Sequence, residues 1–327
     1  MNRAMLTRSA AVASITMALG LLALKLWAAM QTRSTAMLGS LADTALDLVA
    51  SIATLAGVWI ASMPAYEDHR FGHGKAEALA AMLQVILIAL SAAGIGFRAV
   101  SQLAAGQRVA AAEEGIAVSL VAILATFALL AWQRHVIRRT GSLAITTDHL
   151  HYQSDLFLNL AVIAALALDR FAGFGLADPL FGLGIAGWLL WGAWRAAGKA
   201  IDHLMDREWP EEKRQSFVAL AARHPELSNL HDLRTRTSGA QDFVQFHVDL
   251  PGGMSVDQAH AILDRVEADL LSHFPQMELL IHIDPVGHTD EPDNPLVERD
   301  EFGQLDNSDN GRMDTPGGVS TARDRAR

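Results

Sequence analysis

The sequence contains no cysteine, which excludes disulfide-stabilised folds, thiolate metal sites and cysteine nucleophiles. Charged residues make up only 19% of the 327 residues, against about 25% in ordinary soluble domains, and aromatic residues only 6%. Hydrophobic residues reach 51%, so a chain that is disordered over its whole length is also excluded. Any metal chemistry in this chain must therefore use histidine, aspartate and glutamate.

The net charge of −10 is unevenly distributed along the chain. Residues 1–206 carry a net charge of +1, residues 207–285 carry −6 and residues 286–327 carry −5. A net-acidic chain is a poor partner for nucleic acid, so that class of function is excluded. The pattern predicts three parts: a membrane domain over 1–206, a soluble acidic domain over 207–285, and a disordered acidic tail over 286–327.

The first part contains apolar stretches long enough to cross a bilayer, which takes about 20 residues. There are six of them, and we expect a six-helix, all-α membrane bundle with spans near residues 10–30, 36–62, 76–103, 115–132, 150–168 and 176–197. Nine lysines and arginines fall on one side of these spans and four on the other, so both termini are expected in the cytoplasm. Lys25 lies inside the first span, and we expect its side chain to extend toward the outer surface.

The second part shows the patterns of a small α+β domain. Apolar spacing, alternation and turn residues predict two helices and three strands, in the order helix 210–223, strand 230–237, strand 243–250, helix 255–273 and strand 279–284. This αββαβ order is typical of a two-layer fold.

Four ionisable residues lie within the second and fifth predicted spans. Asp43 and Asp47 are four residues apart, as are His151 and Asp155, so each pair shares one helical face. An acidic group in a membrane costs several kcal/mol (~3 kcal/mol on insertion scales) unless it is paired, ligated or hydrated. Three carboxylates and one imidazole suit tetrahedral Zn²⁺ or a similar divalent ion. The alternative is a hydrogen-bonded polar network that holds the helices together.

Longer motifs surround these residues. They are SLADTALD at 40–47, FGHGKAEA at 71–78, HLHYQSD at 149–155 and HDLRTR at 231–236. With them the sequence resembles the cation diffusion facilitator family, and within it the bacterial zinc/iron efflux branch, over roughly residues 8–285. The resemblance implies a homodimeric exporter in the lipid bilayer of the bacterial inner membrane, which exchanges cytoplasmic divalent metal for protons and is not an enzyme. It also implies that the C-terminal domain is ferredoxin-like.

The resemblance assigns roles in the membrane domain residue by residue. Asp43, Asp47, His151 and Asp155 match the family's transport site. Leu150 matches an apolar gate beside it. Lys75 and Asp206 match a charge pair that links the membrane and cytoplasmic parts; the alternative is an ordinary surface ion pair.

The resemblance implies a second, less complete site in the loop after the second span. His69 and His73 match its two histidines, but Tyr66 stands where the family usually has an aspartate. Asp68 or Glu67 could substitute. The alternative is that both imidazoles are solvated loop residues.

A third set of residues matches the family's binuclear regulatory site in the cytoplasmic domain. Its members are His231, His247, His260, His282 and Asp284. His282 and Asp284 are two apart and so project from one face of a strand. We expect bound metal to offset the repulsion between two acidic domains and to stabilise their pairing.

The sequence therefore predicts a divalent cation: proton antiporter. Zn²⁺ is favoured as substrate and regulatory ligand, with Fe²⁺, Cd²⁺ and Co²⁺ as alternatives, and protons are the counter-ion. A passive metal channel and an intramembrane metalloenzyme are the competing functions. The enzyme is disfavoured because four ligands fill the zinc shell and the sequence has no His-Glu-x-x-His motif.

Overall fold

The computed structural model describes residues 3–32, 35–105, 116–174, 176–287 and 300–302. By their internal contacts the residues form two compact units. The first unit comprises residues 1–206 with 238–240, and the second comprises 207–237 with 241–327.

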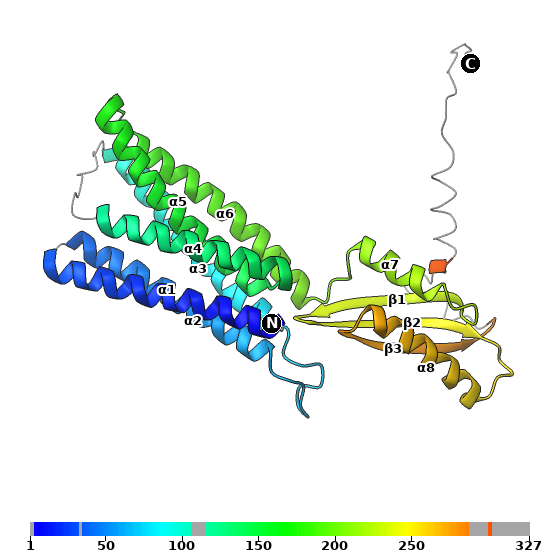
Figure 1. The fold of residues 1–327 in the computed structure, drawn as a ribbon. Coiled ribbons are helices and arrows are strands. Elements are labelled where there is room, and N and C mark those ends of the chain that lie inside the picture. Colours follow the sequence, from blue (N-terminus) through cyan, green and yellow to red (C-terminus); the bar gives the residue numbers. More distant parts are fainter. Residues whose placement is uncertain (1–2, 33–34, 106–115, 175, 288–299, 303–327) are drawn as a thin grey trace, which may run out of the picture. The chain divides into compact units, whose positions relative to one another are not determined.

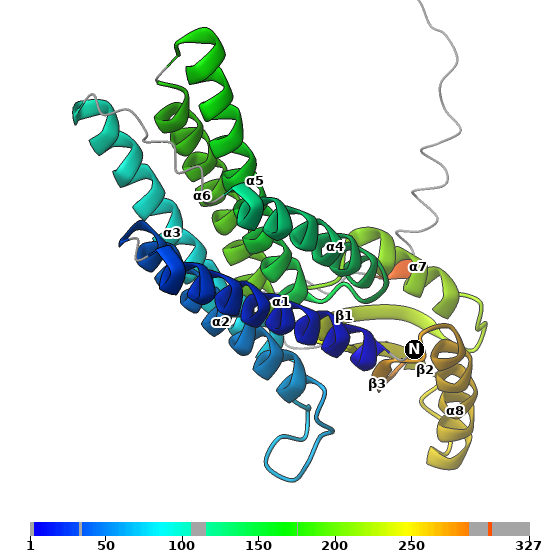
Figure 2. The same cartoon turned by 60° about the vertical axis from the view of Figure 1, so that its left-hand side comes forward.

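The first unit is helical (Figure 1). Its described helices are α1 (Arg3–Thr32), α2 (Thr35–Ala61), α3 (Ala76–Ala105), α4 (Ile116–Thr140), α5 (Leu143–Ala172) and α6 (Ala177–Leu204). The closest packing is between α3 and α6 and between α1 and α2, and each pair runs side by side in both views (Figures 1 and 2). Helix α5 contacts α2, α3, α4 and α6, so it lies at the centre of the bundle.

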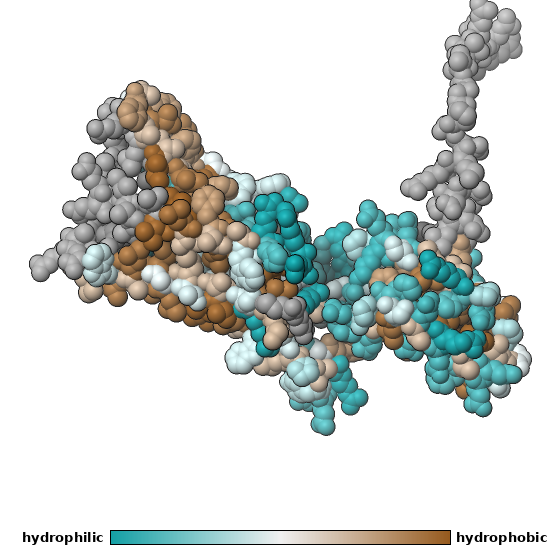
Figure 3. Space-filling view, in the orientation of Figure 1, coloured by the Kyte–Doolittle hydropathy of each residue, from teal (hydrophilic) through white to brown (hydrophobic). Residues whose placement is uncertain are grey.

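Many large apolar side chains of this unit point outward, and many of its buried positions are small or polar. Exposed examples occur on every helix: Trp27, Leu46, Phe97, Leu124, Ile163 and Trp194. Brown, apolar side chains accordingly dominate the helical unit in Figure 3. Buried positions include Ala11, Ala81, Ala144 and Ala200. Lipid supplies no hydrophobic drive between helices, so small interfacial residues and an apolar exterior are typical of a membrane bundle.

Within the described residues, three helices are long and apolar enough to cross a membrane. They are Arg3–Trp27, Thr44–Ala61 and Ala76–Ala105. The predicted count of six spans is therefore not established by this criterion. Helices α1 and α5 begin seven residues earlier than the predicted spans, at Arg3 and Leu143. An apolar window finds only the lipid-facing part of a helix, whereas the backbone hydrogen bonds continue into its polar end.

The second unit has the predicted order of elements. It contains α7 (Glu211–Ala221), β1 (Ser228–Ser238), β2 (Gln241–Leu250), α8 (Val256–His273) and β3 (Met277–Pro285). The strands form one sheet in the order β1-β2-β3, and β2 and β3 are parallel because α8 connects them. Ser255 and Gln258 form a reciprocal capping box that starts α8.

The two faces of this sheet have different characters. Phe246 and Val248 of β2 are buried together with Phe217 of α7 and Leu270 of α8, so the helices cover one face. His247 lies between Phe246 and Val248 and therefore points to the other face. The alternation of β2 thus separates His247 from the apolar core of the second unit.

The acidic tail lies mostly outside the described residues, at 288–299 and 303–327. Its described part is ordered against α7. Arg214 Nη1 lies 2.6 Å from Glu301 Oε1, and Phe302 packs on the apolar core of the second unit. These contacts had no signal in the sequence, because a single apolar residue in a polar tail leaves no periodicity, and disorder of the tail stays a prediction.

Candidate metal centres

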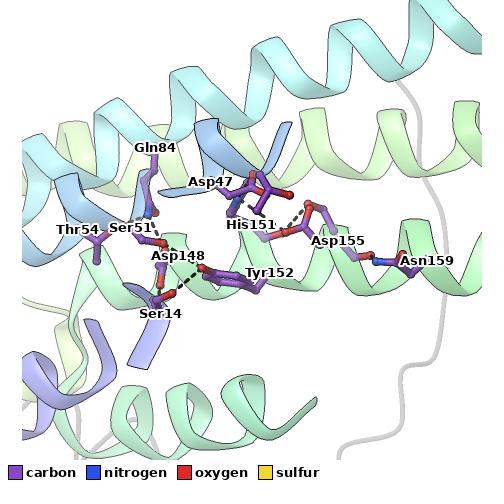
Figure 4. Close-up of polar contacts among 12 residues, drawn as sticks. Ser14, Asp47, Ser51, Thr54, Gln84, Asp148, His151, Tyr152, Asp155 and Asn159 are labelled. Carbon is purple, nitrogen blue, oxygen red and sulfur yellow. Dashed lines mark hydrogen bonds and ion pairs between the residues drawn. The ribbon is translucent and has the colours of Figure 1, made fainter. Parts of the chain in front are cut away.

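Helices α2 and α5 bring three of the predicted transport ligands together (Figure 4). Nε2 of His151 lies 3.0 Å from Oδ1 of Asp47 and 3.9 Å from Oδ2 of Asp155. One donor atom from each of the three residues lies within 4.8 Å of the other two. The side chain of Asp43, the fourth predicted ligand, lies outside the described residues.

The spacing of these donors suits a small divalent cation. Zn²⁺ holds nitrogen and oxygen ligands at about 2.0 Å, so ligand atoms of a tetrahedral shell lie about 3.3 Å apart. The 3.0 and 3.9 Å separations bracket that value. His151 is buried and both carboxylates are half-buried, so a cation could enter without unfolding the helices. The chemistry available is reversible coordination by oxygen and nitrogen.

Leu150, the predicted gate, points to another part of the bundle. It packs on the apolar cluster formed by α3 and α6, which includes Ile88 and Leu189. A methyl group added at Gly192 of α6 would lie 2.9 Å from Leu150 Cδ2. Leu150 therefore occupies the contact between α5 and α6, while His151 faces α2.

A second buried polar group on α5 escaped the sequence analysis. The carboxylate of Asp148 is fully buried and accepts hydrogen bonds from Ser14 Oγ (2.6 Å), Gln84 Nε2 (2.9 Å) and Gln133 Nε2 (2.8 Å). Tyr152, one turn further along α5, donates to the backbone carbonyl oxygen of Ser14 (3.0 Å). This Asp148 network joins α5 to α1, α3 and α4. Figure 4 shows its members Ser14 and Gln84 around Asp148. Its one signal in the sequence is the i, i+4 spacing of Asp148 and Tyr152.

The loop after α2 gathers aromatic rings. The ring of Tyr66 lies 5.0 Å from that of His69 and 5.1 Å from that of His73, and the two imidazoles lie 4.8 Å apart. The described part of the chain contains two groups of three or more histidine or carboxylate donors within 4.8 Å of one another, and neither group lies in this loop. Asp68 therefore does not complete a site of that kind here.

The predicted charge pair is formed within the first unit. Lys75 Nζ lies 3.0 Å from Asp206 Oδ2 and also donates to the carbonyl oxygen of Leu204 (3.2 Å). The side chains are 38% and 35% exposed, so water screens the pair considerably.

The second unit has a cluster of histidines around one carboxylate. Asp284 Oδ2 lies 2.9 Å from His247 Nδ1 and 3.6 Å from His231 Nε2, and its Oδ1 lies 3.5 Å from His282 Nε2. His247 and His282 are neighbours in the parallel register of β2 and β3. Donor atoms of His231, His247 and Asp284 lie within 4.8 Å of one another, so these three residues could hold a cation.

His260 does not join this cluster within the described chain. Its side chain is 74% exposed on α8, and its Nδ1 lies 3.7 Å from Oδ1 of Asp264, one turn away. The structure instead adds Asp232, whose Oδ2 lies 3.8 Å from His247 Nε2. Asp232 has a left-handed backbone (φ +46°), which alters the alternation of β1 in a way that the sequence does not reveal.

The comparisons with known proteins agree with this architecture. Residues 11–205 match the cation efflux transmembrane domain, and residues 209–286 match the cytoplasmic domain of cation efflux proteins. The chain belongs to the cation efflux family. Its members are membrane transporters of divalent metal cations rather than enzymes, so the resemblance to cation diffusion facilitators is confirmed.

The curated relatives align with most of this chain and with nearly all of their own length. The cation-efflux pump FieF of Klebsiella pneumoniae is 40% identical over 86% of this chain and 93% of its own, and that of Escherichia coli is 39% identical over the same shares. The metal-bound C-terminal domain of the CzcD transporter from Thermotoga maritima aligns with 25% of this chain and 99% of its own, at 26% identity and a TM-score of 0.24.

Proposed function

We propose that this cation efflux protein exchanges a cytoplasmic divalent cation, preferably Zn²⁺, for protons at a transport site made of Asp43, Asp47, His151 and Asp155. The observation that carries the proposal is the convergence of Asp47, His151 and Asp155 from two helices inside a bundle with an apolar exterior. Fe²⁺, Cd²⁺ and Co²⁺ remain alternative cargoes, because the same donor set accommodates them.

Proton coupling follows from competition for the same atoms. A metal ion binds only deprotonated carboxylates and a neutral imidazole, so metal binding displaces protons. When the site opens to the cytoplasm, the cation replaces protons. When it opens to a more acidic exterior, protons replace the cation. The proton gradient would then drive efflux.

The architecture proposed for this cycle is a homodimer with six spans per chain. Each helix from α1 to α6 has 25 to 30 residues, so at 1.5 Å per residue each exceeds the hydrocarbon core of about 30 Å. The excess of basic residues on one side supports cytoplasmic termini. We place the protein in the bacterial inner membrane, where a proton gradient is available.

The test is transport into sealed proteoliposomes. With a pH gradient imposed and equal Zn²⁺ on both sides, wild-type protein should move the metal uphill, and Asp47→Ala and His151→Ala should abolish the movement. Asp178→Ala is a matched control, because it removes a carboxylate from the first turn of α6, outside the described donor group. Flux that follows only the metal gradient would indicate a channel, and full transport by Asp47→Ala would refute the site. A panel of Fe²⁺, Cd²⁺ and Co²⁺ would rank the cargo.

The histidine cluster supports a second role, as a regulatory metal site in the cytoplasm. Asp249 and Asp284 are neighbours in the register of β2 and β3, and both are buried. Two adjacent buried carboxylates repel each other, and Oδ1 of Asp249 has no hydrogen-bond partner among the described residues. A cation between His231, His247 and Asp284 would relieve this repulsion and would lower the charge of an acidic domain that must pair with its copy.

This regulatory role predicts that metal strengthens the dimer. In the full-length protein, added Zn²⁺ should shift the monomer–dimer equilibrium toward the dimer, and His247→Ala should raise the required metal concentration. His273→Ala, which removes an imidazole at the end of α8, is the control. An unchanged metal threshold in His247→Ala would contradict the role.

A further inference from the structure

Lys25 is a charged residue in the C-terminal third of the membrane helix α1, and its side chain turns inward. Its Nζ donates a hydrogen bond to Oγ1 of Thr44 on α2, at 2.6 Å. Thr44 is buried, and it lies three residues before Asp47 on the same helix. The expectation that Lys25 extends toward the membrane surface is therefore wrong. An ammonium group held inside a bilayer normally has an anionic partner, because its isolated burial is costly.

The charged groups near this ammonium belong to the transport site. Helix α1 packs against α2, α4 and α5. Asp47 lies one turn from Thr44 on α2, and the ammonium of Lys25 interacts electrostatically with Asp155 on α5. Asp148, His149, His151 and Tyr152 are the other titratable groups on this part of α5, and α4 has no charged residue before Arg134. Carboxylates thus outnumber the cations around Lys25.

We propose that Lys25 is the built-in counter-cation of the transport site. The inference rests on the proposed function, and it treats Lys25 as a positioning residue and not as a metal ligand. In the metal-free site the ammonium balances one of the carboxylate charges. When a dication binds, the same ammonium repels it.

Two measurable effects follow from this placement. First, Lys25 lowers the affinity of the site for divalent metal, because a fixed positive charge lies about one helical turn from the cation in a medium of low dielectric constant. Second, it lowers the number of protons that metal displaces, because the empty site needs fewer protons to balance its carboxylates. The first effect favours release of the cation, which an exporter requires, and the second sets how many protons are exchanged for each ion.

The experiment is calorimetric titration of purified full-length protein with Zn²⁺ in several buffers of different ionisation enthalpy, which gives affinity and proton release together. Lys25→Met should bind Zn²⁺ at least about tenfold more tightly than wild type and release roughly one more proton per ion. Lys25→Arg keeps the charge and should rescue both values toward wild type. Lys199→Met, which removes an exposed lysine near the end of α6, is the matched control.

The sign of the change separates this role from a structural one. If Lys25 only held α1 against α2, Lys25→Met would bind Zn²⁺ more weakly with the same proton count, and the inference would be overturned. Lys25→Gln keeps a donor for Thr44 without the charge, so it gives the same test if Lys25→Met does not fold. If Asp47→Ala binds Zn²⁺ as tightly as the wild type does, the proposed function itself is refuted.

Discussion

Replacing Asp148 with alanine should destabilise the membrane unit, even though it removes a buried charge. The carboxylate accepts three hydrogen bonds, from Ser14, Gln84 and Gln133. Its removal leaves those donors facing a small void at the junction of α1, α3, α4 and α5. The opposing effect is that the folded state no longer has to bury an ionised carboxylate, which by itself would be stabilising.

The magnitude depends on how far the donors can find other partners. Hydrogen bonds between membrane helices contribute about 0.6 kcal/mol on average and at most about 1.7 kcal/mol, so three of them give roughly 2 to 5 kcal/mol. The lower end applies here, because each donor has a second partner within reach: the carbonyl oxygen of Ala10 for Ser14, Oγ1 of Thr54 for Gln84, and Oγ of Ser14 for Gln133. We therefore expect a loss of about 2 kcal/mol, or a fall in the melting temperature of roughly 4–8 °C.

Thermal unfolding of the purified protein in detergent, followed by size-exclusion chromatography, measures this loss. Thr16→Ala is the control, because it removes an exposed hydroxyl of α1 that bonds only to the backbone. The same assay on Ser14→Ala should give a smaller loss, since one of the three bonds disappears. A melting temperature that is unchanged or raised in Asp148→Ala would mean that burial of the charge outweighs its bonds, and the reasoning would be refuted.

Two further predictions concern the packing and the charge pair of the membrane unit. A methyl group at Gly57 would overlap the side chain of Ala80 where α2 meets α3. Gly57→Ala should therefore lower the stability of the protein by about 1–3 kcal/mol, measured by thermal unfolding. Gly20→Ala on α1 is the control, because the space around Gly20 is open and the substitution should not destabilise the protein. Lys75→Ala should cost less than about 1 kcal/mol, because its partner Asp206 is also partly exposed; a larger loss would mean that the pair is shielded from water.

The sequence predicted the helices and strands well because each leaves a periodic signal. Apolar runs located the membrane helices, and the alternation around Phe246 and Val248 located a central strand of the sheet. The ends of the helices escaped prediction because they are polar, as at Arg3. Phe302 escaped because one apolar residue in a polar tail has no period.

The candidate sites were predictable where ligands share one local element. The spacing of His151 and Asp155 placed both on one face of α5, and the structure brings Asp47 beside them. Asp148 was missed because its donors come from three other helices, and a single sequence shows no sign of such long-range bonds. His260 was assigned by resemblance alone, and nothing local to α8 determines what its exposed side chain contacts.

The distribution of residues around α5 predicts which helices move together. At about 100° per residue, Asp148, His151 and Asp155 fall within one sector of α5, and Leu150 faces the opposite side. The Asp148 network thus ties the ligand face of α5 to α1, α3 and α4, while the contact of Leu150 with Gly192 of α6 has only apolar packing. We expect sliding during transport to occur at this apolar contact.

The absence of cysteine makes that expectation directly testable. A methyl group at Gly192 would lie 2.9 Å from Leu150 Cδ2, so the double variant Leu150→Cys, Gly192→Cys brings two thiols close enough to be joined by oxidation or a short bifunctional reagent. Cross-linking should stop Zn²⁺ transport in proteoliposomes, and reduction should restore it. Each single cysteine variant, treated in the same way, controls for loss of the native side chain. Full transport by the cross-linked protein would show that α5 and α6 move as one body and that the sliding surface lies elsewhere.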